Sequence, residues 1–286
     1  MANRPLRQFY DHDRDFGLPL SADDVVEPWR RHRHRFVESL RTLDDDDWLG
    51  ATRCDEWNAQ EMIHHLVTAD GFFTFTLTSA RAAEPTSFLR DFDPTTSPGE
   101  AALGLGPLTP GETLAAFESS TAAFIEAVDA LDADGWTQIA ESPLGHVPAV
   151  MSLAHGAWDS MIHERDIFVP RGRAPELFDD EIWLSTVYSL WAAAIQGGLI
   201  GDEHAVAPGP DTPIDITLGF DDVADRSIRV RVGETVSIEP LEGVGDAVAA
   251  GSALALVEGF TGRQDIGSVA LPDDLLDHLT RAAQIL

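Results

Sequence analysis

Three residues spaced four apart along the chain, His155, Asp159 and His163, carry side chains that could bind a metal ion. This spacing is close to one turn of an α-helix, so all three side chains would share one face, with about 6 Å of rise between neighbours. The residues that flank this face on a helical wheel are apolar: Met151, Trp158 and Ile162. Two imidazoles and a carboxylate turned toward an apolar interior need a partner, and a divalent metal ion is the simplest one.

A second predicted helix carries two consecutive histidines, only one of which is expected to point inward. Asn58 followed by Glu61 is typical of a helix start in which each side chain caps the backbone N–H of the other residue. His65 lies at the edge of the apolar stripe of this helix, whereas His64 points about 100° further round, among polar residues. The stripe consists of Met62, Leu66, Ala69 and Phe73. We therefore expect His65, and not His64, to join the ligand set.

The first predicted helix begins after Ser21 and places an arginine within its apolar stripe. Arg33 lies four residues after Trp29 and three before Phe36, both members of that stripe. Two explanations stay open at this point. Either the guanidinium reaches the surface along the apolar stem of its side chain, or it turns inward and binds the anionic group of a cofactor.

The composition excludes several kinds of chemistry. All 19 basic residues are arginines, which excludes a Schiff-base lysine and a phosphate-loop lysine. The formal net charge of −30 argues against nucleic acid or an anionic membrane as partner, because both would be repelled. Cys54, the single cysteine, cannot form an internal disulfide; a small buried loop residue is expected there, with a reactive thiol as the alternative. Without a long apolar run, the expected location is the cytoplasm.

The apolar pattern divides the chain into an irregular arm (residues 1–20), a helical domain (21–175) and a C-terminal domain (176–286). Four long helices with connections of medium length favour an antiparallel four-helix bundle for the helical domain. Residues 85–111, rich in Pro, Gly and Thr, form a longer connection that is either a lid or an insertion. The second and fourth helices of such a bundle face each other, so the predicted ligands can meet at one point in its core.

The C-terminal domain begins with a linker and an apolar helix, predicted over residues 180–200. Segments that alternate between apolar and polar residues then predict antiparallel strands at residues 214–220, 227–232 and 235–239, followed by helices at 251–260 and 272–285. The expected fold class is therefore α+β.

Three runs carry a resemblance to a known family: WNAQEMIHHL (residues 57–66), WDSMIHERDIFVP (158–170) and SALALVEGFTGR (252–263). In this order and spacing they resemble the mycothiol-dependent maleylpyruvate isomerase family, a two-domain branch of the DinB-like metalloproteins. The resemblance covers roughly residues 25–286. It implies an N-terminal DinB-like four-helix bundle with a divalent metal ion, usually zinc, and a smaller C-terminal α/β domain.

The resemblance assigns the ligands by position. His65 corresponds to the ligand of the second helix, and Asp159 and His163 correspond to the pair on the fourth. The family usually has Glu where this chain has Asp159, so the acidic ligand is one methylene shorter here. His155, one turn earlier, is a further candidate ligand that would complete or replace the set. Zinc is the expected metal, with nickel as the alternative.

The resemblance also implies chemistry with mycothiol or another low-molecular-weight thiol as cofactor. A bound metal lowers the pKa of an entering thiol, so a thiolate is available at neutral pH. In the isomerase branch this thiolate adds to a conjugated cis-diacid, and elimination after bond rotation gives the trans product; other branches transfer the thiol for good. Arg263 stands where the family has a functional arginine that would bind a substrate carboxylate. The alternative is a surface arginine paired with Asp265 or Glu258.

The expected function is thus that of a metal-dependent enzyme, either a thiol S-transferase or a thiol-assisted cis/trans isomerase. Two other functions stay open: a non-catalytic DinB-like binding protein, and a hydrolase in which the metal carries water. The expected partners are a small thiol and a small electrophile, and not nucleic acid or a membrane. We expect a monomer or a homodimer.

Overall fold

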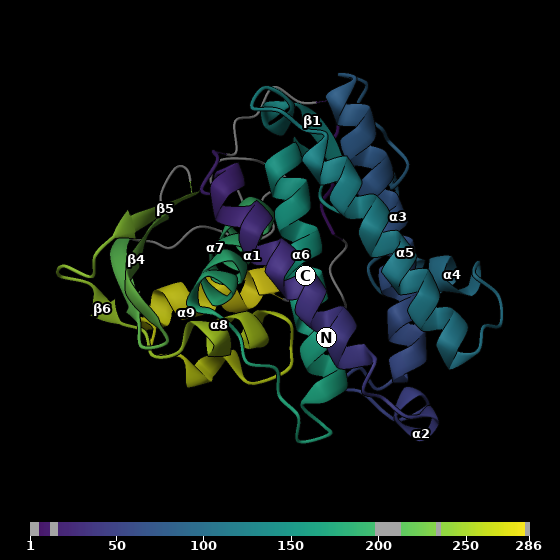
Figure 1. Cartoon of the computed structure of the whole chain (residues 1–286). Coiled ribbons are helices and arrows are strands. Elements are labelled where there is room, and N and C mark those ends of the chain that lie inside the picture. Colours follow the sequence, from purple (N-terminus) through teal and green to yellow (C-terminus); the bar gives the residue numbers. More distant parts are fainter. Residues whose placement is uncertain (1–5, 12–16, 198–212, 233–235, 284–286) are drawn as a thin grey trace. The chain divides into compact units, whose positions relative to one another are not determined.

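The computed structural model describes residues 6–11, 17–197, 213–232 and 236–283 (Figure 1). These residues form two compact units. The bundle unit holds residues 8–11 and 22–176. The C-terminal unit holds residues 6, 7 and 17–21 together with the described part of 177–286.

Four long helices build the bundle unit: α1 (Ala22–Leu40), α3 (Ala59–Arg81), α5 (Pro110–Asp129) and α6 (Ala149–Phe168). Helix α1 packs against α5 and α6, and α3 packs against the same two helices, so each has two neighbours (Figure 1). Together with the strands of the C-terminal unit, this arrangement confirms the predicted α+β class with an N-terminal DinB-like helical part.

The starts of α3 and α5 follow from their sequences. The side chain of Asn58 accepts a hydrogen bond from the backbone N–H of Glu61, and the side chain of Glu61 accepts one from Asn58, both at 2.9 Å. This confirms the predicted cap. Thr109 and Glu112 repeat the arrangement at α5, with Pro110 at the first helical position, where its missing N–H costs nothing.

Helix α6 is the central helix of the bundle unit. Of its 20 residues, 17 are buried, which is typical of a helix that is covered on almost every side. Gly156 allows it to approach α3 closely, because a Cβ at this position would lie 3.1 Å from two ring carbons of Phe73. The ring of Phe73 is itself stacked on Phe124 of α5, with 5.7 Å between ring centroids. The two helices that carry the predicted ligands are therefore in direct contact.

A β-hairpin precedes α6. Strands β1 (Ile139–Ser142) and β2 (Gly145–Pro148) pair in antiparallel register. Strands of only four residues give too short an alternating pattern to stand out in the sequence among Pro and Gly. Phe9 of the N-terminal segment lies against Gly145, which adopts φ = +93°, and a Cβ there would lie 2.3 Å from the carbonyl oxygen of Phe9.

Glu141 of β1 joins three parts of the bundle unit although its side chain is fully buried. It accepts hydrogen bonds from the hydroxyl groups of Tyr10 (2.6 Å) and Thr86 (2.7 Å). It also accepts from the backbone N–H groups of Phe88 (2.7 Å) and Leu89 (2.6 Å). One carboxylate thus holds the N-terminal segment and the chain after α3 against the hairpin.

The long connection between α3 and α5 contains a short helix, α4 (Ser97–Leu103), which packs against α3. A second short helix, α2 (Asp45–Trp48), joins α1 to α3 and is capped by Asp44. A 3-10 turn, η1 (Gly135–Thr137), lies between α5 and β1.

The C-terminal unit begins with α7 (Asp179–Gly197), which packs on a four-stranded sheet and on two later helices (Figure 1). The sheet order is β5-β4-β3-β6, with antiparallel neighbours except for the parallel pair β3–β6. Its strands are β3 (Ile214–Phe220), β4 (Val223–Val232), β5 (Val236–Glu242) and β6 (Val248–Ala249), and they are followed by α8 (Ala253–Phe260), η2 (Ile266–Ser268) and α9 (Asp273–Ala283).

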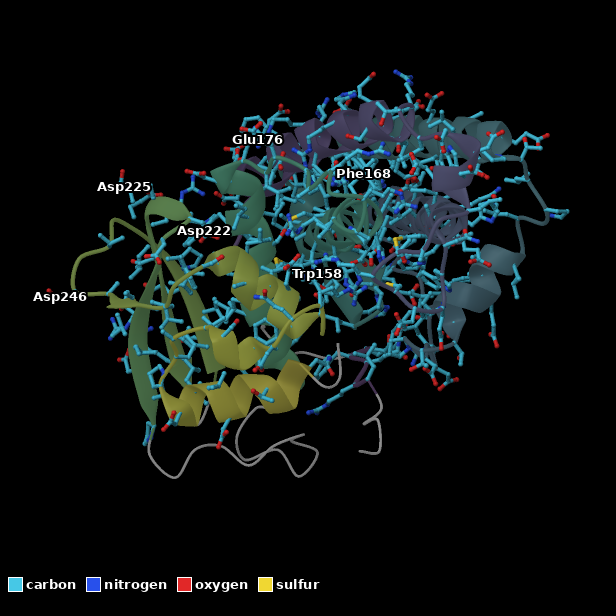
Figure 2. All side chains as sticks on the ribbon, turned by 90° about the horizontal axis from the view of Figure 1, so that it is seen from below. Trp158, Phe168, Glu176, Asp222, Asp225 and Asp246 are labelled. Carbon is cyan, nitrogen blue, oxygen red and sulfur yellow. The ribbon has the colours of Figure 1, made fainter. Side chains whose placement is uncertain are left out.

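The turn between β3 and β4 also starts α8. The carboxylate of Asp222, labelled in Figure 2, accepts hydrogen bonds from the backbone N–H groups of Ala253 (2.7 Å) and Leu254 (3.1 Å). The three strands predicted from alternation are present here, and β6, only two residues long, gave no such signal. Within the described residues, no helix combines the length and the apolar character that crossing a membrane requires.

Candidate metal centre

The structure brings three of the predicted ligands together inside the bundle unit. Asp159 lies between the two histidines: its Oδ2 is 3.3 Å from Nε2 of His65, and its Oδ1 is 3.3 Å from Nε2 of His163. One ligand atom from each residue lies within 4.8 Å of the others. Asp159 and His163 come from α6 and His65 from α3, so the close approach of these helices forms the group. We call these three residues the ligand trio.

The geometry of the ligand trio fits a divalent metal ion. Two nitrogen and one oxygen donors are the set found in catalytic zinc sites, which keep a fourth position open. Donors about 2.0 to 2.1 Å from a tetrahedral ion are about 3.3 Å apart. Each contact made by Asp159 has this length, one through Oδ2 and one through Oδ1, and one donor atom from each of the three residues lies within 4.8 Å of the others. The side chains remain 9% to 18% exposed, so a small molecule could reach the open position.

The charges within the ligand trio are strongly coupled. Burial alone would raise the pKa of Asp159, but the two neighbouring histidines hold that pKa well below its usual range. Burial opposes a charge on His163, yet Asp159 and Asp166 raise its pKa well above the ordinary value. A divalent cation between these groups would supply the positive charge that Asp159 otherwise draws from the two imidazoles.

The two consecutive histidines of α3 point as predicted. His65 faces Asp159, whereas Nε2 of His64 lies 2.9 Å from the hydroxyl of Thr113 on α5. Burial lowers the pKa of His64, which favours its neutral form. The helical register inferred from the apolar stripe is confirmed.

His155 lies outside the ligand trio. Its ring packs against Phe73 (5.8 Å between centroids) and against Trp158, which Figure 2 labels (5.7 Å). Burial lowers the pKa of His155 to about 4, so the imidazole is neutral at pH 7. A ligand role for His155 stays a prediction.

Trp57 lies beside the ligand trio and also lines a neighbouring cavity. Its ring centroid is 5.1 Å from that of His65 and 6.1 Å from that of His163. The cavity, about 620 Å³ in volume, lies on the His64 side of α3. Its other walls come from the start of α3 and from residues 99–108, including α4.

Three residues that the sequence did not connect with the metal site form a hydrogen-bonded group on the Nδ1 side of His163. Its Nδ1 lies 3.0 Å from Oδ2 of Asp166, which is fully buried. Cys54 donates its thiol hydrogen to the same oxygen at 3.4 Å, and Nε of Arg53 donates to Oδ1 at 3.0 Å. Cys54 is a partly buried loop residue, as predicted. A signal for Asp166 was present, because it lies three residues after His163 and so on a neighbouring position of the same helix.

Arg33 is buried, which rules out the surface explanation of its position. Its Nη2 forms an ion pair with Asp70 of α3, and its Nη1 donates to the hydroxyl of Ser160 on α6 at 3.2 Å. Asp70 also accepts from the hydroxyl of Ser120 at 2.8 Å. Burial lowers the pKa of Arg33 to about 9, which leaves it charged at neutral pH. The inward orientation agrees with the second explanation, but the partner within the chain is Asp70; binding of a cofactor stays a prediction.

A protein-family model identifies the family to which the bundle unit belongs. The model of the mycothiol maleylpyruvate isomerase N-terminal domain matches residues 5–168, more than half of the chain. The chain belongs to the mycothiol maleylpyruvate isomerase family. The match includes every member of the ligand trio together with Arg33 and Asp166, and confirms the resemblance seen in the sequence.

Solved structures extend the likeness beyond that domain. The crystal structure of the mycothiol-dependent maleylpyruvate isomerase has a TM-score of 0.59 and 17% identity, covering 89% of this chain and 96% of that one. A histidine-to-alanine mutant of that isomerase gives a TM-score of 0.57 with the same identity and coverage. At this identity the likeness establishes the fold of this family member. No curated protein sequence matches the chain.

Arg263, the remaining predicted site residue, lies in the C-terminal unit just after α8. Its Nη1 donates to the backbone carbonyl of Thr261 at 2.6 Å, and its backbone N–H donates to the backbone carbonyl of Glu258 at 2.8 Å. Gly262 between them adopts φ = +70°, a conformation that turns the chain sharply after the helix. A substrate-binding role for Arg263 stays a prediction.

Proposed function

We propose that this chain is a metal- and thiol-dependent enzyme that isomerises a small conjugated diacid, with a mycothiol-type thiol as cofactor. The observation that carries the proposal is the convergence of His65, Asp159 and His163 on one point of a DinB-like bundle. Membership of the mycothiol maleylpyruvate isomerase family supports the thiol and the substrate class.

A divalent ion held by the ligand trio, most simply zinc, would lower the pKa of a thiol entering the open position, so that the thiolate is available at neutral pH. The two imidazoles and the carboxylate of the chain supply the ligands and orient them from two rigid helices. Trp57 lies beside the trio and lines the neighbouring cavity, so its ring is placed to contact a molecule that enters there.

The nucleophile comes from the cofactor in this proposal. The thiol of Cys54 donates to Asp166 on the Nδ1 side of His163, whereas Asp159 lies on the Nε2 side. Cys54 therefore points away from the open position. A thiol cofactor, when bound, would supply a nucleophile that adds reversibly to the cis double bond and leaves again from the trans isomer, with no net consumption of thiol.

The test uses zinc-loaded protein with maleylpyruvate, in the presence and absence of mycothiol, followed by ultraviolet absorption and by NMR of the product. Turnover to the trans isomer that requires both zinc and thiol is expected, and Cys54→Ser should retain it. Accumulation of a stable thiol adduct would instead identify an S-transferase. Hydrolysis of the substrate in the absence of thiol would identify a hydrolase. A protein that binds no zinc would favour a binding function.

We propose further that Arg263 binds a substrate carboxylate. In a chain without lysine, arginines are the main cations available for this task. Loss of a bidentate contact to a buried carboxylate should cost roughly 2 to 4 kcal/mol, so Arg263→Ala should lower kcat/KM about 30-fold to 1,000-fold. Zinc content should stay unchanged. Wild-type kinetics in Arg263→Ala would place this residue at an ordinary surface position.

A further inference from the structure

Asp166 is a fully buried carboxylate whose partners connect it to the ligand trio but not to the open position. Its Oδ2 lies 3.0 Å from Nδ1 of His163 and 3.4 Å from the thiol sulfur of Cys54. Its Oδ1 accepts from Nε of Arg53 at 3.0 Å, and its backbone carbonyl accepts from the backbone N–H of Arg53 at 3.1 Å. The side chain of Asp166 is thus held from the loop before α3 as well as from α6.

These contacts determine which nitrogen of His163 carries a hydrogen. A carboxylate only accepts hydrogen bonds, so Nδ1 of His163 must be the donor in its contact with Asp166. The other nitrogen, Nε2, faces Asp159 at 3.3 Å. A neutral imidazole with its hydrogen on Nδ1 has its lone pair on Nε2, where the trio converges.

We propose that Asp166 is a positioning residue for the metal centre: anchored by Arg53 and Cys54, it holds Nδ1–H of His163 and so presents the Nε2 lone pair to the ion. The inference rests on the proposed metal-dependent function. It adds a residue that touches neither metal nor substrate but determines how well one ligand binds.

A competing explanation makes Asp166 a ligand itself, because Cys54, His163 and Asp166 also bring ligand atoms within 4.8 Å of one another. The guanidinium of Arg53 argues against it. This cation already lies on Oδ1 of Asp166, and it would repel a divalent ion bound to the same carboxylate. The thiol of Cys54 is a hydrogen-bond donor in this arrangement, a role that a serine hydroxyl can also fill.

The experiment compares Asp166→Asn with Glu164→Gln. Asparagine has the shape of aspartate but only one side-chain oxygen, and the guanidinium of Arg53 needs that oxygen as its acceptor. The NH2 group of the asparagine therefore faces Nδ1 of His163, where a second donor disfavours the tautomer with its hydrogen on Nδ1. Glu164 is a matched control, because it is buried on the same helix and pairs with His32 (3.2 Å) and Arg35 (2.9 Å) of α1 instead of a ligand.

Two readouts are measured for each protein: zinc affinity by competition with a chromophoric chelator, and the Nδ1 proton of His163 by NMR in the metal-free protein. Wild type and Glu164→Gln should show a slowly exchanging downfield proton. Asp166→Asn should lose it and should bind zinc about 10-fold to 100-fold more weakly, the range found for outer-shell carboxylates. Equal zinc affinity in the two variants, or survival of the proton signal in Asp166→Asn, would overturn the proposal.

Two further variants keep the test decisive. Arg53→Ala removes the anchor without touching His163 and should weaken zinc binding about 10-fold, the lower end of that range, so an unchanged affinity would count against the anchor even if Asp166→Asn fails to fold. Cys54→Ser should bind zinc like wild type; a loss as large as that of Asp166→Asn would instead make Cys54 and Asp166 ligands. Wild-type protein that shows the proton signal but binds no zinc would contradict the proposed function itself.

Discussion

Glu141 and Asp159 are both carboxylates inside the bundle unit, but their partners differ in kind. Glu141 accepts four hydrogen bonds from two hydroxyl groups and two backbone N–H groups, all of which are donors at any ordinary pH. Asp159 faces two imidazole nitrogens, which donate only when they are protonated. The first carboxylate is fully satisfied within the chain, and the second is satisfied only when the Nε2 atoms of both histidines carry a hydrogen.

The contrast distinguishes a structural cluster from a site that can accept a ligand. Glu141 is surrounded by four groups that always donate hydrogen bonds to it, so no acceptor atom of this cluster is left to bind a cation. Around Asp159, three groups that can all act as acceptors converge, which is costly unless protons or a cation lie between them. The buried ion pair of Arg33 and Asp70 lies between these two cases: it is charged, but both the cation and the anion belong to the chain.

The largest loss of stability is expected for Glu141→Ala. Four buried donors would lose their acceptor, at roughly 1 kcal/mol or more each, so the free energy of unfolding should fall by about 4 kcal/mol. Denaturant unfolding of the metal-free protein measures it. Glu118→Ala is the control, because this half-exposed residue pairs with Arg41 at the surface and should cost less than about 1 kcal/mol. Similar unfolding midpoints for the two variants would contradict the structural role of Glu141.

The next effect is expected for Arg33→Leu, which leaves Asp70 buried without its cation. The loss should be about 3 kcal/mol, and most of it should return in the double variant Arg33→Leu/Asp70→Leu, because an apolar pair replaces a buried ion pair at little cost. The double variant also tests the predicted cofactor role. A stable protein with an unchanged KM for the thiol would assign Arg33 to structure alone, whereas a raised KM would support cofactor binding.

The smallest loss of stability is expected for Asp159→Asn in the metal-free protein, about 1 kcal/mol, because the amide keeps the shape and part of the hydrogen bonding. The response to metal should differ far more. Wild type should gain about 2.7 kcal/mol at a free zinc concentration 100 times its Kd, and Asp159→Asn should gain almost nothing. His64→Ala should respond to zinc like wild type. A zinc response that disappears in His64→Ala but persists in Asp159→Asn would exclude the ligand trio as the site.

The ligand trio could be predicted from the sequence because its signal is local. Helical periodicity alone places Asp159 and His163 on one face and separates His65 from His64. The cap formed by Asn58 and Glu61 is equally local. The pairing between the two helices followed from the expected four-helix bundle, in which the second and fourth helices face each other, and the resemblance to the family then assigned the same three residues.

The buried carboxylates could not be predicted in the same way, because their partners are distant in sequence. Asp70 pairs with a residue 37 positions away, and Glu164 with one 129 positions away. Glu164 falls outside the metal-binding face of the helical wheel, yet it is fully buried against α1. A helix covered on almost every side has no solvent face, so a wheel cannot tell a surface charge from a buried pair there.

The N-terminal segment has a consequence for the order of folding. Gln8 donates to the carbonyl of Pro143, 135 residues later, and Phe9 pairs with Leu144 and His146 of the hairpin. At a synthesis rate of about 5 to 20 residues per second, these partners leave the ribosome about 7 to 27 seconds after the segment itself. Gln8 and Phe9 are therefore among the last residues of the bundle unit to reach their native contacts, and the hairpin before α6 closes this unit only when its synthesis is nearly complete.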